Sequence, residues 1–380
     1  MKVIKLNENW YEEALKLSEY AFQYKVPEEE KEKLFDMMKE HHELYGILDG
    51  DELAANMHFL PLEVFLGGKK MRMGGLAGVA TYPEYRRQGH VREMLEFTLQ
   101  KLKEEGYPLS MLHPFKVSFY RKYGWELFSD RLVSTLTSED LTVHKKVEGT
   151  VKRVAKEAHN SEIDLLYDAF AEPFAGMLVR DRAWWENSVY RDYTLGVYYN
   201  KEKQPKGYIL YKVKDKKMTA AEFVPLNEEA RHGLWNFICQ HDSMIKELVM
   251  ITHKDEPIFH LLPDPRIKAE IKPYFMARIV DAEAFLKEYP FKEGKVTLHI
   301  TDEYASWNNG SFSVSEEKAE KTGESSEGIS LSINDLAAIL FGYQSVEALS
   351  LIGKVKGEKT ELEKFSSMLP GLTPFFYDFF

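Results

Sequence analysis

Two hydrophobic periodicities alternate along the first third of the chain. Apolar residues spaced three and four apart, such as Trp10, Ala14, Leu17 and Ala21, predict amphipathic helices. The runs on either side of Gly67-Gly68 predict two strands of a β-hairpin. The expected helices cover residues 10–24, 28–41, 89–104 and 116–122, and the expected strands cover 44–48, 53–66, 71–81, 109–112 and a stretch from Trp125 onward. This order predicts an α+β domain.

The same order of elements returns after about residue 150, with little sequence identity. Helices are expected at 161–171, 180–190 and 227–241, and strands at 193–199, 207–213, 217–225 and 246–252. A repeated order of this kind indicates an internal duplication.

A third, smaller α+β block begins near Asp281. Strands are expected at 296–301, 311–315 and 329–333, a polar loop at 316–328, a helix ending at Leu340, and short helices near 345–352 and 360–368. The chain is therefore expected to be α+β (mixed α/β) throughout, with domains at 1–146, 147–285 and 286–380.

Charge and cysteine content indicate which ligands and which cellular compartment to expect. The chain has 50 Lys+Arg against 61 Asp+Glu, a net charge of −11, which disfavours nucleic acid and suits a cationic small molecule. The single cysteine, Cys239, excludes an intramolecular disulfide and favours a reducing compartment, so a cytoplasmic location is expected. The acidic N-terminal stretch does not resemble a secretory signal, no apolar run is long enough to span a membrane, and the histidines lack metal-ligand spacing.

The most informative stretch links an apolar strand to the long helix through an arginine-rich loop. Gly89 opens the helix, whose first N–H groups are free to bind an anion, and Arg86, Arg87 and Arg92 add positive charge. This arrangement predicts a cradle for a pyrophosphate. An ordinary solvated basic loop is the alternative that the residues alone leave open.

The loop Arg86-Arg87-Gln88-Gly89-His90-Val91 resembles the acetyl-CoA loop of the GCN5-related N-acetyltransferases (GNAT), [QR]-x-x-G-x-[GA], from which Val91 departs. Over its whole length the chain resembles the enhanced intracellular survival (Eis) acetyltransferase family. That resemblance implies an active GNAT domain at 1–146, a degenerate one at 147–285 and a sterol-carrier-protein-like (SCP2-like) domain at 286–380.

The resemblance also implies which residues bind acetyl-CoA. Backbone groups of Val79, Ala80 and Thr81 would pair with the pantetheine arm, and Phe115 and Lys116 would lie on the other side of the coenzyme. The expected pyrophosphate site comprises Arg86, Arg87, Gln88, Gly89, His90, Val91 and Arg92. No metal is expected. In the second block, Glu228 and Glu229 occupy the corresponding helix start and would repel phosphates, so that domain should not bind acetyl-CoA.

A second motif, Phe119-Tyr120-Arg121-Lys122-Tyr123-Gly124-Trp125, resembles the family segment that carries the general acid. A phenol has a pKa near 10, so it can protonate a departing thiolate at neutral pH. The resemblance assigns this role to Tyr120, whereas Tyr123 is expected to pack. His113 either lines the substrate pocket or satisfies a core carbonyl, and the second role is favoured.

The chain ends in Pro374-Phe375-Phe376-Tyr377-Asp378-Phe379-Phe380, an unusually aromatic tail. Exposing this much apolar surface is unfavourable, so the tail is expected to tuck into the protein, as plain packing or at a subunit interface. The resemblance implies instead that the carboxylate of Phe380 is the catalytic base.

Together these features predict an acetyl-CoA-dependent N-acetyltransferase that acts on primary amines of a cationic molecule such as an aminoglycoside or a polyamine. The family resemblance further implies a homohexamer. A non-catalytic acyl-CoA sensor and a lipid carrier acting through the third domain are the alternatives.

Overall fold

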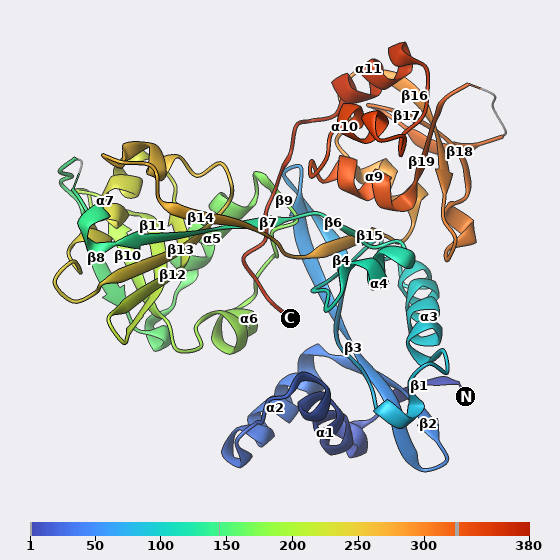
Figure 1. The fold of residues 1–380 in the computed structure, drawn as a ribbon, viewed down its shortest axis with the longest axis horizontal. Helices are drawn as coiled ribbons and strands as arrows, with labels where there is room; N and C mark the ends of the chain where they lie inside the picture. Colours follow the sequence, from blue (N-terminus) through green and yellow to red (C-terminus); the bar gives the residue numbers. More distant parts are fainter. Residues whose placement is uncertain (1, 144, 324–326) are drawn as a thin grey trace.

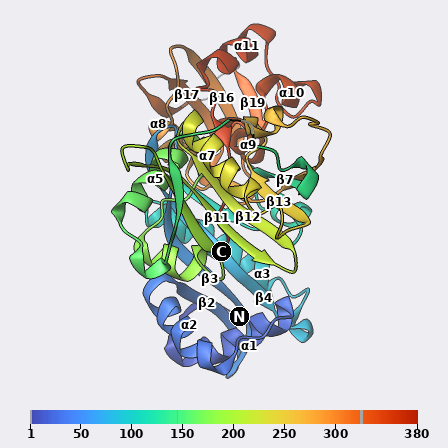
Figure 2. The ribbon, with the colours of Figure 1, turned by 90° about the vertical axis from the view of Figure 1, so that its left-hand side faces the viewer.

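The computed structural model describes residues 2–143, 145–323 and 327–380. The chain forms three units, each built on its own β-sheet with helices packed against it (Figure 1). The C-terminal segment leaves the third unit and ends between the other two (Figures 1 and 2).

The first sheet has seven strands in the order β1-β2-β3-β4-β5-β15-β6, and only β4 and β5 pair in parallel. Its strands are β1 (Val3–Leu6), β2 (Glu43–Asp49), β3 (Glu52–Leu66), β4 (Lys69–Thr81), β5 (Leu109–Leu112), β15 (Met276–Ile279) and β6 (Glu126–Leu127). The helices of this unit are α1 (Tyr11–Phe22), α2 (Glu28–His41), α3 (His90–Glu104) and α4 (Val117–Lys122).

The second sheet repeats this plan with the order β14-β7-β13-β12-β11-β10-β8. Its strands are β14 (Lys268–Pro273), β7 (Asp130–Thr137), β13 (Glu247–Thr252), β12 (Lys217–Pro225), β11 (Pro205–Lys214), β10 (Thr194–Tyr199) and β8 (Thr150–Val154). The helices of the second unit are α5 (Ser161–Ala171), α6 (Arg182–Trp184) and α7 (Glu228–Cys239). Strands β12 and β13 pair in parallel, as β4 and β5 do.

The two large sheets exchange strands. β7 follows the first sheet in sequence but lies in the second, between β13 and β14. β15 comes after the second sheet in sequence but lies in the first, between β5 and β6. The hydrogen-bonded sheets therefore do not follow the segments 1–146 and 147–285 that the repeat predicts.

The third unit has a four-stranded sheet in the order β18-β17-β16-β19. Its strands are β16 (Lys295–Thr301), β17 (Gly310–Ser315), β18 (Ala319–Thr322) and β19 (Ile329–Ser332), and its helices are α8 (Ala282–Glu288), α9 (Ile333–Leu340), α10 (Val346–Leu351) and α11 (Lys359–Met368). The expectation of a loop throughout 316–328 is wrong, because β18 lies within that range. Residues 324–326 lie outside the described residues. A two-residue strand, β20 (Thr373–Pro374), then pairs with β9 (Phe174–Ala175) of the second unit.

Most expected elements are confirmed, and α2, α5, β5 and β12 have the expected bounds. The expected helix at 180–190 is only partly regular, since α6 covers three residues and a π-helical turn, Trp185–Val189, follows it. None of the helices in the described ranges combines the length and apolar composition that a bilayer-spanning helix needs.

A buried ion cluster holds the C-terminal segment between the units. The Asp378 carboxylate accepts hydrogen bonds from Arg180 Nε (2.9 Å) and Trp184 Nε1 (2.8 Å). The same guanidinium donates to both carboxylate oxygens of Glu222 on β12, at 2.5 and 3.1 Å. All three charged residues are buried, so each charge depends on its partners to replace lost hydration.

A second arginine binds the main chain of the same segment. The guanidinium of Arg131, on β7, lies 3.4 Å from the centre of the Tyr274 ring and donates to the carbonyls of Phe376, Tyr377 and Asp378. The Tyr274 hydroxyl donates to the Asp378 carbonyl (2.8 Å). With Arg180, Glu222 and Asp378, Arg131 makes a cluster of two positive and two negative charges.

Replacing Arg180 with methionine should destabilise the protein strongly, because it leaves two buried carboxylates unpaired. We expect a loss of about 3–5 kcal/mol in the free energy of unfolding, measured by urea denaturation. The matched control is Arg266→Met, which breaks an exposed pair with Asp264 and should leave the free energy of unfolding nearly unchanged. Equal losses in both variants would contradict a structural role for the buried cluster.

Candidate active site

Strand β4 parts from β5 halfway along its length. The parallel pairing stops at Leu76–Leu112, because β5 ends there while β4 continues to Thr81. On its other side, the register between β3 and β4 shifts, so that Gly78 and Val79 form a bulge, with Gly78 at φ +57°. Beyond Leu76, the peptide groups of β4 therefore have no strand partner on the β5 side.

Helix α3 begins beside this opening. Its N-cap is Gly89 at φ +92°, and no described side chain caps the helix. Apart from its chain neighbours and the helix's own backbone, a Cβ built on Gly89 meets no atom of the described residues within 4 Å, so the space beside it is open. The first N–H groups of the helix and the positive end of its dipole suit a phosphate.

The opening and the helix start border one cavity of about 640 Å³. Arg86, Arg87 and Arg92 line it, and among the described residues no aspartate or glutamate does. Arg86 donates to the Thr81 carbonyl (3.3 Å), Arg92 pairs with Glu96 (2.8 Å), and Arg87 makes no ion pair with a described residue. The cavity is thus locally positive in an acidic protein.

Two buried polar atoms of this cavity have no partner within the described ranges, Thr81 Oγ1 and His90 Nε2. Buried polar atoms are seldom left unsatisfied. The uncapped helix start and the three arginines fit a molecule that carries a pyrophosphate.

The structure brings together most of the residues expected to bind acetyl-CoA. Those that line the cavity are Val79, Ala80, Thr81, Arg86, Arg87, Gly89, His90, Val91, Arg92 and Phe115. Gln88 and Lys116 do not line it, since the Gln88 side chain donates to the Glu84 carbonyl (3.2 Å) and Lys116 is the exposed N-cap of α4. Motif reasoning missed the aromatic wall, formed by Phe22, Tyr85, Phe119 and Tyr123.

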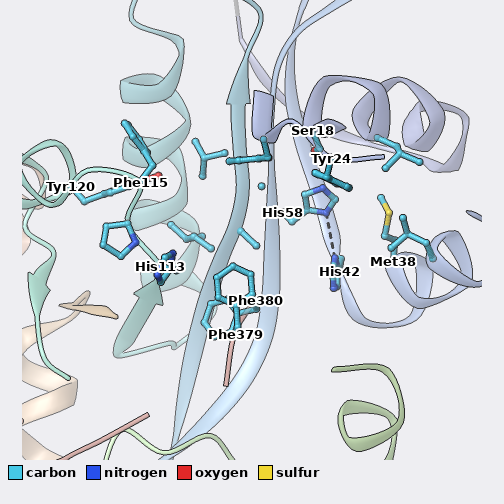
Figure 3. A pocket seen from close by; sticks show the side chains of 18 residues that line it. Ser18, Tyr24, Met38, His42, His58, His113, Phe115, Tyr120, Phe379 and Phe380 are labelled. Carbon is cyan, nitrogen blue, oxygen red and sulfur yellow. Dashed lines mark hydrogen bonds between the residues drawn. The ribbon is translucent and has the colours of Figure 1, made fainter. Parts of the chain in front are cut away.

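A second cavity of about 500 Å³ adjoins the first and shares Phe22, Val79 and Phe115 with it. Tyr120 and Phe380 both line this second cavity, although 260 positions of sequence separate them (Figure 3). Tyr120 is buried against the rings of Phe115 and Phe119 (centroids 5.5 and 5.2 Å). No hydrogen bond joins its hydroxyl to another described residue.

Burial raises the pKa of Tyr120 above its ordinary value of 10. The phenol therefore keeps its proton at neutral pH, which a general acid requires.

The aromatic tail is buried as expected up to Asp378, and its last two residues enter the second cavity. A Cβ on Gly75 would lie only 2.9 Å from Phe380 Cε2, so glycine at that position of β4 leaves room for the ring. The Phe380 ring also packs edge-on against Phe275, with centroids 5.0 Å apart. Phe379 lies beside His113 (5.1 Å).

Three histidines line the second cavity, and two of them, His42 and His58, were not expected there. His42 and His58 face each other with their Nδ1 atoms 3.3 Å apart, and burial lowers their pKa values to about 3 and about 4. His113 lines the cavity and is exposed, so the favoured expectation of a core role is wrong. No short-range motif links His42 to His58, because the β2–β3 hairpin brings them together.

The equivalent opening of the second unit is already filled. Asn227 caps α7 by accepting from Ala230 N (2.8 Å), and Glu228 and Glu229 occupy its first turn. The wedge between β12 and β13 contains the Tyr377 hydroxyl, which accepts from Phe223 N (3.2 Å). These contacts support the prediction that this unit does not bind acetyl-CoA.

The described residues contain no group of three His, Cys, Asp or Glu side chains arranged to hold a metal ion.

Comparisons with known proteins identify three domains. Residues 2–128 match an acetyltransferase (GNAT) domain family, residues 176–279 match a second acetyltransferase (GNAT) family, and residues 282–377 match a sterol carrier protein domain.

Several known proteins are similar to this chain in sequence or in fold. N-acetyltransferase Eis of Mycobacterium bovis is 25% identical over 236 residues, which are 58% of this chain and 58% of the relative, so the match spans little more than half of that protein. A probable N-acyltransferase from Enterococcus faecalis superposes with a TM-score of 0.93 at 28% identity, covering 100% of this chain and 99% of the other. Eis1 of Mycobacterium abscessus has the same fold, with a TM-score of 0.85 at 17% identity over 100% of both chains.

The open space at Gly89 is expected to admit the phosphates of acetyl-CoA, so a larger residue there should weaken coenzyme binding. Valine there should raise the dissociation constant of acetyl-CoA at least about tenfold, measured by calorimetry, because the side chain fills the approach to the helix N-terminus. Gly353→Val is the matched control, since Gly353 also has a positive φ (+73°) and open space but lies in the third unit. Unchanged affinity in Gly89→Val would place the phosphates elsewhere.

Proposed function

Because the chain belongs to the Eis-like family of GCN5-related N-acetyltransferases, with two GNAT domains and an SCP2-like C-terminal domain, we propose that its first unit transfers an acetyl group from acetyl-CoA to a primary amine. The cavity at Arg86–Arg92 would bind the coenzyme, and the adjoining cavity would bind the amine. The shared wall at Val79 is where the two substrates would meet.

In this proposal the neutral amine attacks the acetyl carbon, a C–N bond forms and the C–S bond breaks. Unpaired N–H groups of β4 beyond Leu76 would stabilise the oxyanion. Tyr120 would donate its proton to the departing thiolate, and the Phe380 carboxylate would accept the proton lost by the amine. These steps account for every bond and proton of the acetyl transfer, and they use neither a metal ion nor a redox partner.

The observation that carries the proposal is that Tyr120 and Phe380 line one cavity, beside an uncapped basic helix start. A non-catalytic acyl-CoA sensor would need the helix start alone. A lipid carrier acting through the third domain would need neither feature. Steady release of CoA on addition of an amine would separate the proposed enzyme from both alternatives.

The proposal also concerns which kind of amine the protein acetylates. The net charge of −11 favours a cationic amine, and the family resemblance suggests an aminoglycoside or a polyamine. A cytoplasmic location and a homohexamer stay predictions.

Replacing Tyr120 with phenylalanine should lower kcat by about 10²-fold or more and leave KM nearly unchanged, because it removes only the donated proton. The assay is thiol release from acetyl-CoA with a saturating amine. Tyr107→Phe, at a buried tyrosine of the same unit that lines neither cavity, is the control and should retain activity. Equal turnover in Tyr120→Phe and the parent protein would remove Tyr120 from the mechanism.

Residues appended after Phe380 should abolish turnover, because they displace the proposed base or force polar backbone into the cavity. Acetyl-CoA affinity, measured by calorimetry, should change little, and an N-terminal tag should be harmless. Full activity in a protein shown by mass spectrometry to retain its C-terminal extension would overturn the role of the terminal carboxylate.

A further inference from the structure

Helix α4, which carries Tyr120, is too short to be stable by itself. It has six residues, and isolated helices of fewer than about 12 residues are marginal in water. The last four carbonyls of any helix also have no regular partner within it. The position of the Tyr120 phenol therefore depends on the contacts that hold α4 in place.

The third unit binds the end of α4 directly. Asn334, in the first turn of α9, donates through Nδ2 to the carbonyls of Arg121 (2.9 Å) and Trp125 (3.0 Å). Helix α9 also packs against β15 and β6 of the first sheet (Figure 1). One amide of the third unit thus joins the last turn of α4 to the residue just before β6.

A second contact runs through a fully buried arginine. Arg278, on β15, donates through Nε to the Tyr123 carbonyl (3.1 Å), and its Nη2 binds both carboxylate oxygens of Asp302 in the third unit (2.8 and 2.7 Å). Both charged residues are buried, so the guanidinium depends on this carboxylate to replace its lost hydration. Asp302 in turn accepts from the backbone N–H groups of Tyr304 and Ala305, both at 3.1 Å. The Tyr123 carbonyl is therefore fixed by a chain of contacts that ends in the third unit.

Gly124 leaves the space that this contact needs. Its φ is +92°, and a Cβ there would lie 2.6 Å from Arg278 Nε and 2.7 Å from Arg278 Cζ. Glycine is thus required both by the left-handed backbone and by the approach of the guanidinium. The motif that carries Tyr120 therefore also contains the residue that admits the arginine.

The same junction reaches the proposed coenzyme cavity. The rings of Tyr304 and Tyr123 have centroids 4.7 Å apart, and the Arg92 guanidinium lies 5.8 Å from the centre of the Tyr304 ring. Tyr123 and Arg92 both line the coenzyme cavity. The third unit therefore supports α4 and part of this cavity wall together.

We propose that the third unit takes part in acetyl transfer by holding α4, with Asn334 and the Arg278–Asp302 pair as positioning residues for Tyr120. This inference rests on the proposed function, in which Tyr120 protonates the departing thiolate. Proton transfer requires the phenol to lie within hydrogen-bond reach of the sulfur, so a small displacement of α4 should lower turnover. This role differs from that of a lipid carrier and requires no bound lipid.

The kinetic test is a double-mutant cycle in the full chain, assayed by thiol release from acetyl-CoA with spermidine or kanamycin as the amine. Asn334→Ala should lower kcat by about tenfold, because α4 loses the hydrogen bonds from this amide. In the Tyr120→Phe background the same change should lower kcat by less than about twofold, since the proton donor is already absent. Equal losses in the two backgrounds would overturn the inference, because a merely structural effect lowers turnover whether or not the phenol is present.

Hydrogen–deuterium exchange separates this inference from the proposed function, because it needs no turnover. The amides of residues 117–125 should exchange at least about threefold faster in Asn334→Ala than in the parent protein, and those of α1 should not change. If neither amine releases CoA, the proposed function fails, and the exchange rates still decide whether the third unit holds α4. Unchanged exchange at 117–125 would overturn the inference in either case.

The matched control is Asn236→Ala. Asn236 is also a half-buried helix residue, and its Nδ2 donates to a backbone carbonyl, that of Lys145 (2.8 Å), but it lies in the second unit. This variant should leave both kcat and the exchange of residues 117–125 unchanged. Equal effects of the two asparagine variants would contradict a specific role for the third unit.

Discussion

The ion pairs of Arg180 are the contact on which the proposed active site depends. This guanidinium lies in the second unit and binds Asp378, two residues before the end of the chain. Its partner Glu222 fixes it to β12, and Arg131 holds the neighbouring carbonyls. A site assembled from the first unit and the last residues therefore depends on two arginines of the second unit, Arg180 and Arg131.

In the second unit, the C-terminal segment occupies the place that corresponds to the open wedge of the first unit. Where β4 and β5 open into a cavity, the matching wedge between β12 and β13 contains the tail residue Tyr377. Glutamates at the start of α7 make that helix unsuitable for phosphates. The wedge of the second unit thus holds the same segment whose last two residues line a cavity of the first unit.

Local sequence patterns predicted the elements well where these are long and regular. The amphipathic stripe of α3 and the glycine that opens it are visible in sequence, and so is the loop that lines the coenzyme cavity. β14 was missed because it is short and exposed along its whole length, so neither face of it packs on a core, and β15 because it has four residues, all buried. The pairing of His42 with His58, the exchange of strands and the apolar wall of the second cavity arise from tertiary contacts, which no local pattern contains.

The exchange of β7 and β15 also constrains how the protein is made. During synthesis, β5 emerges early with four buried-type residues and only β4 as a partner. Its other edge stays unpaired until residues 276–279 leave the ribosome and insert as β15. An apolar strand edge that stays unpaired during synthesis can pair with other chains, which promotes aggregation of the nascent chain. No continuous segment of the chain therefore contains all the strands of the first sheet without also spanning the second unit.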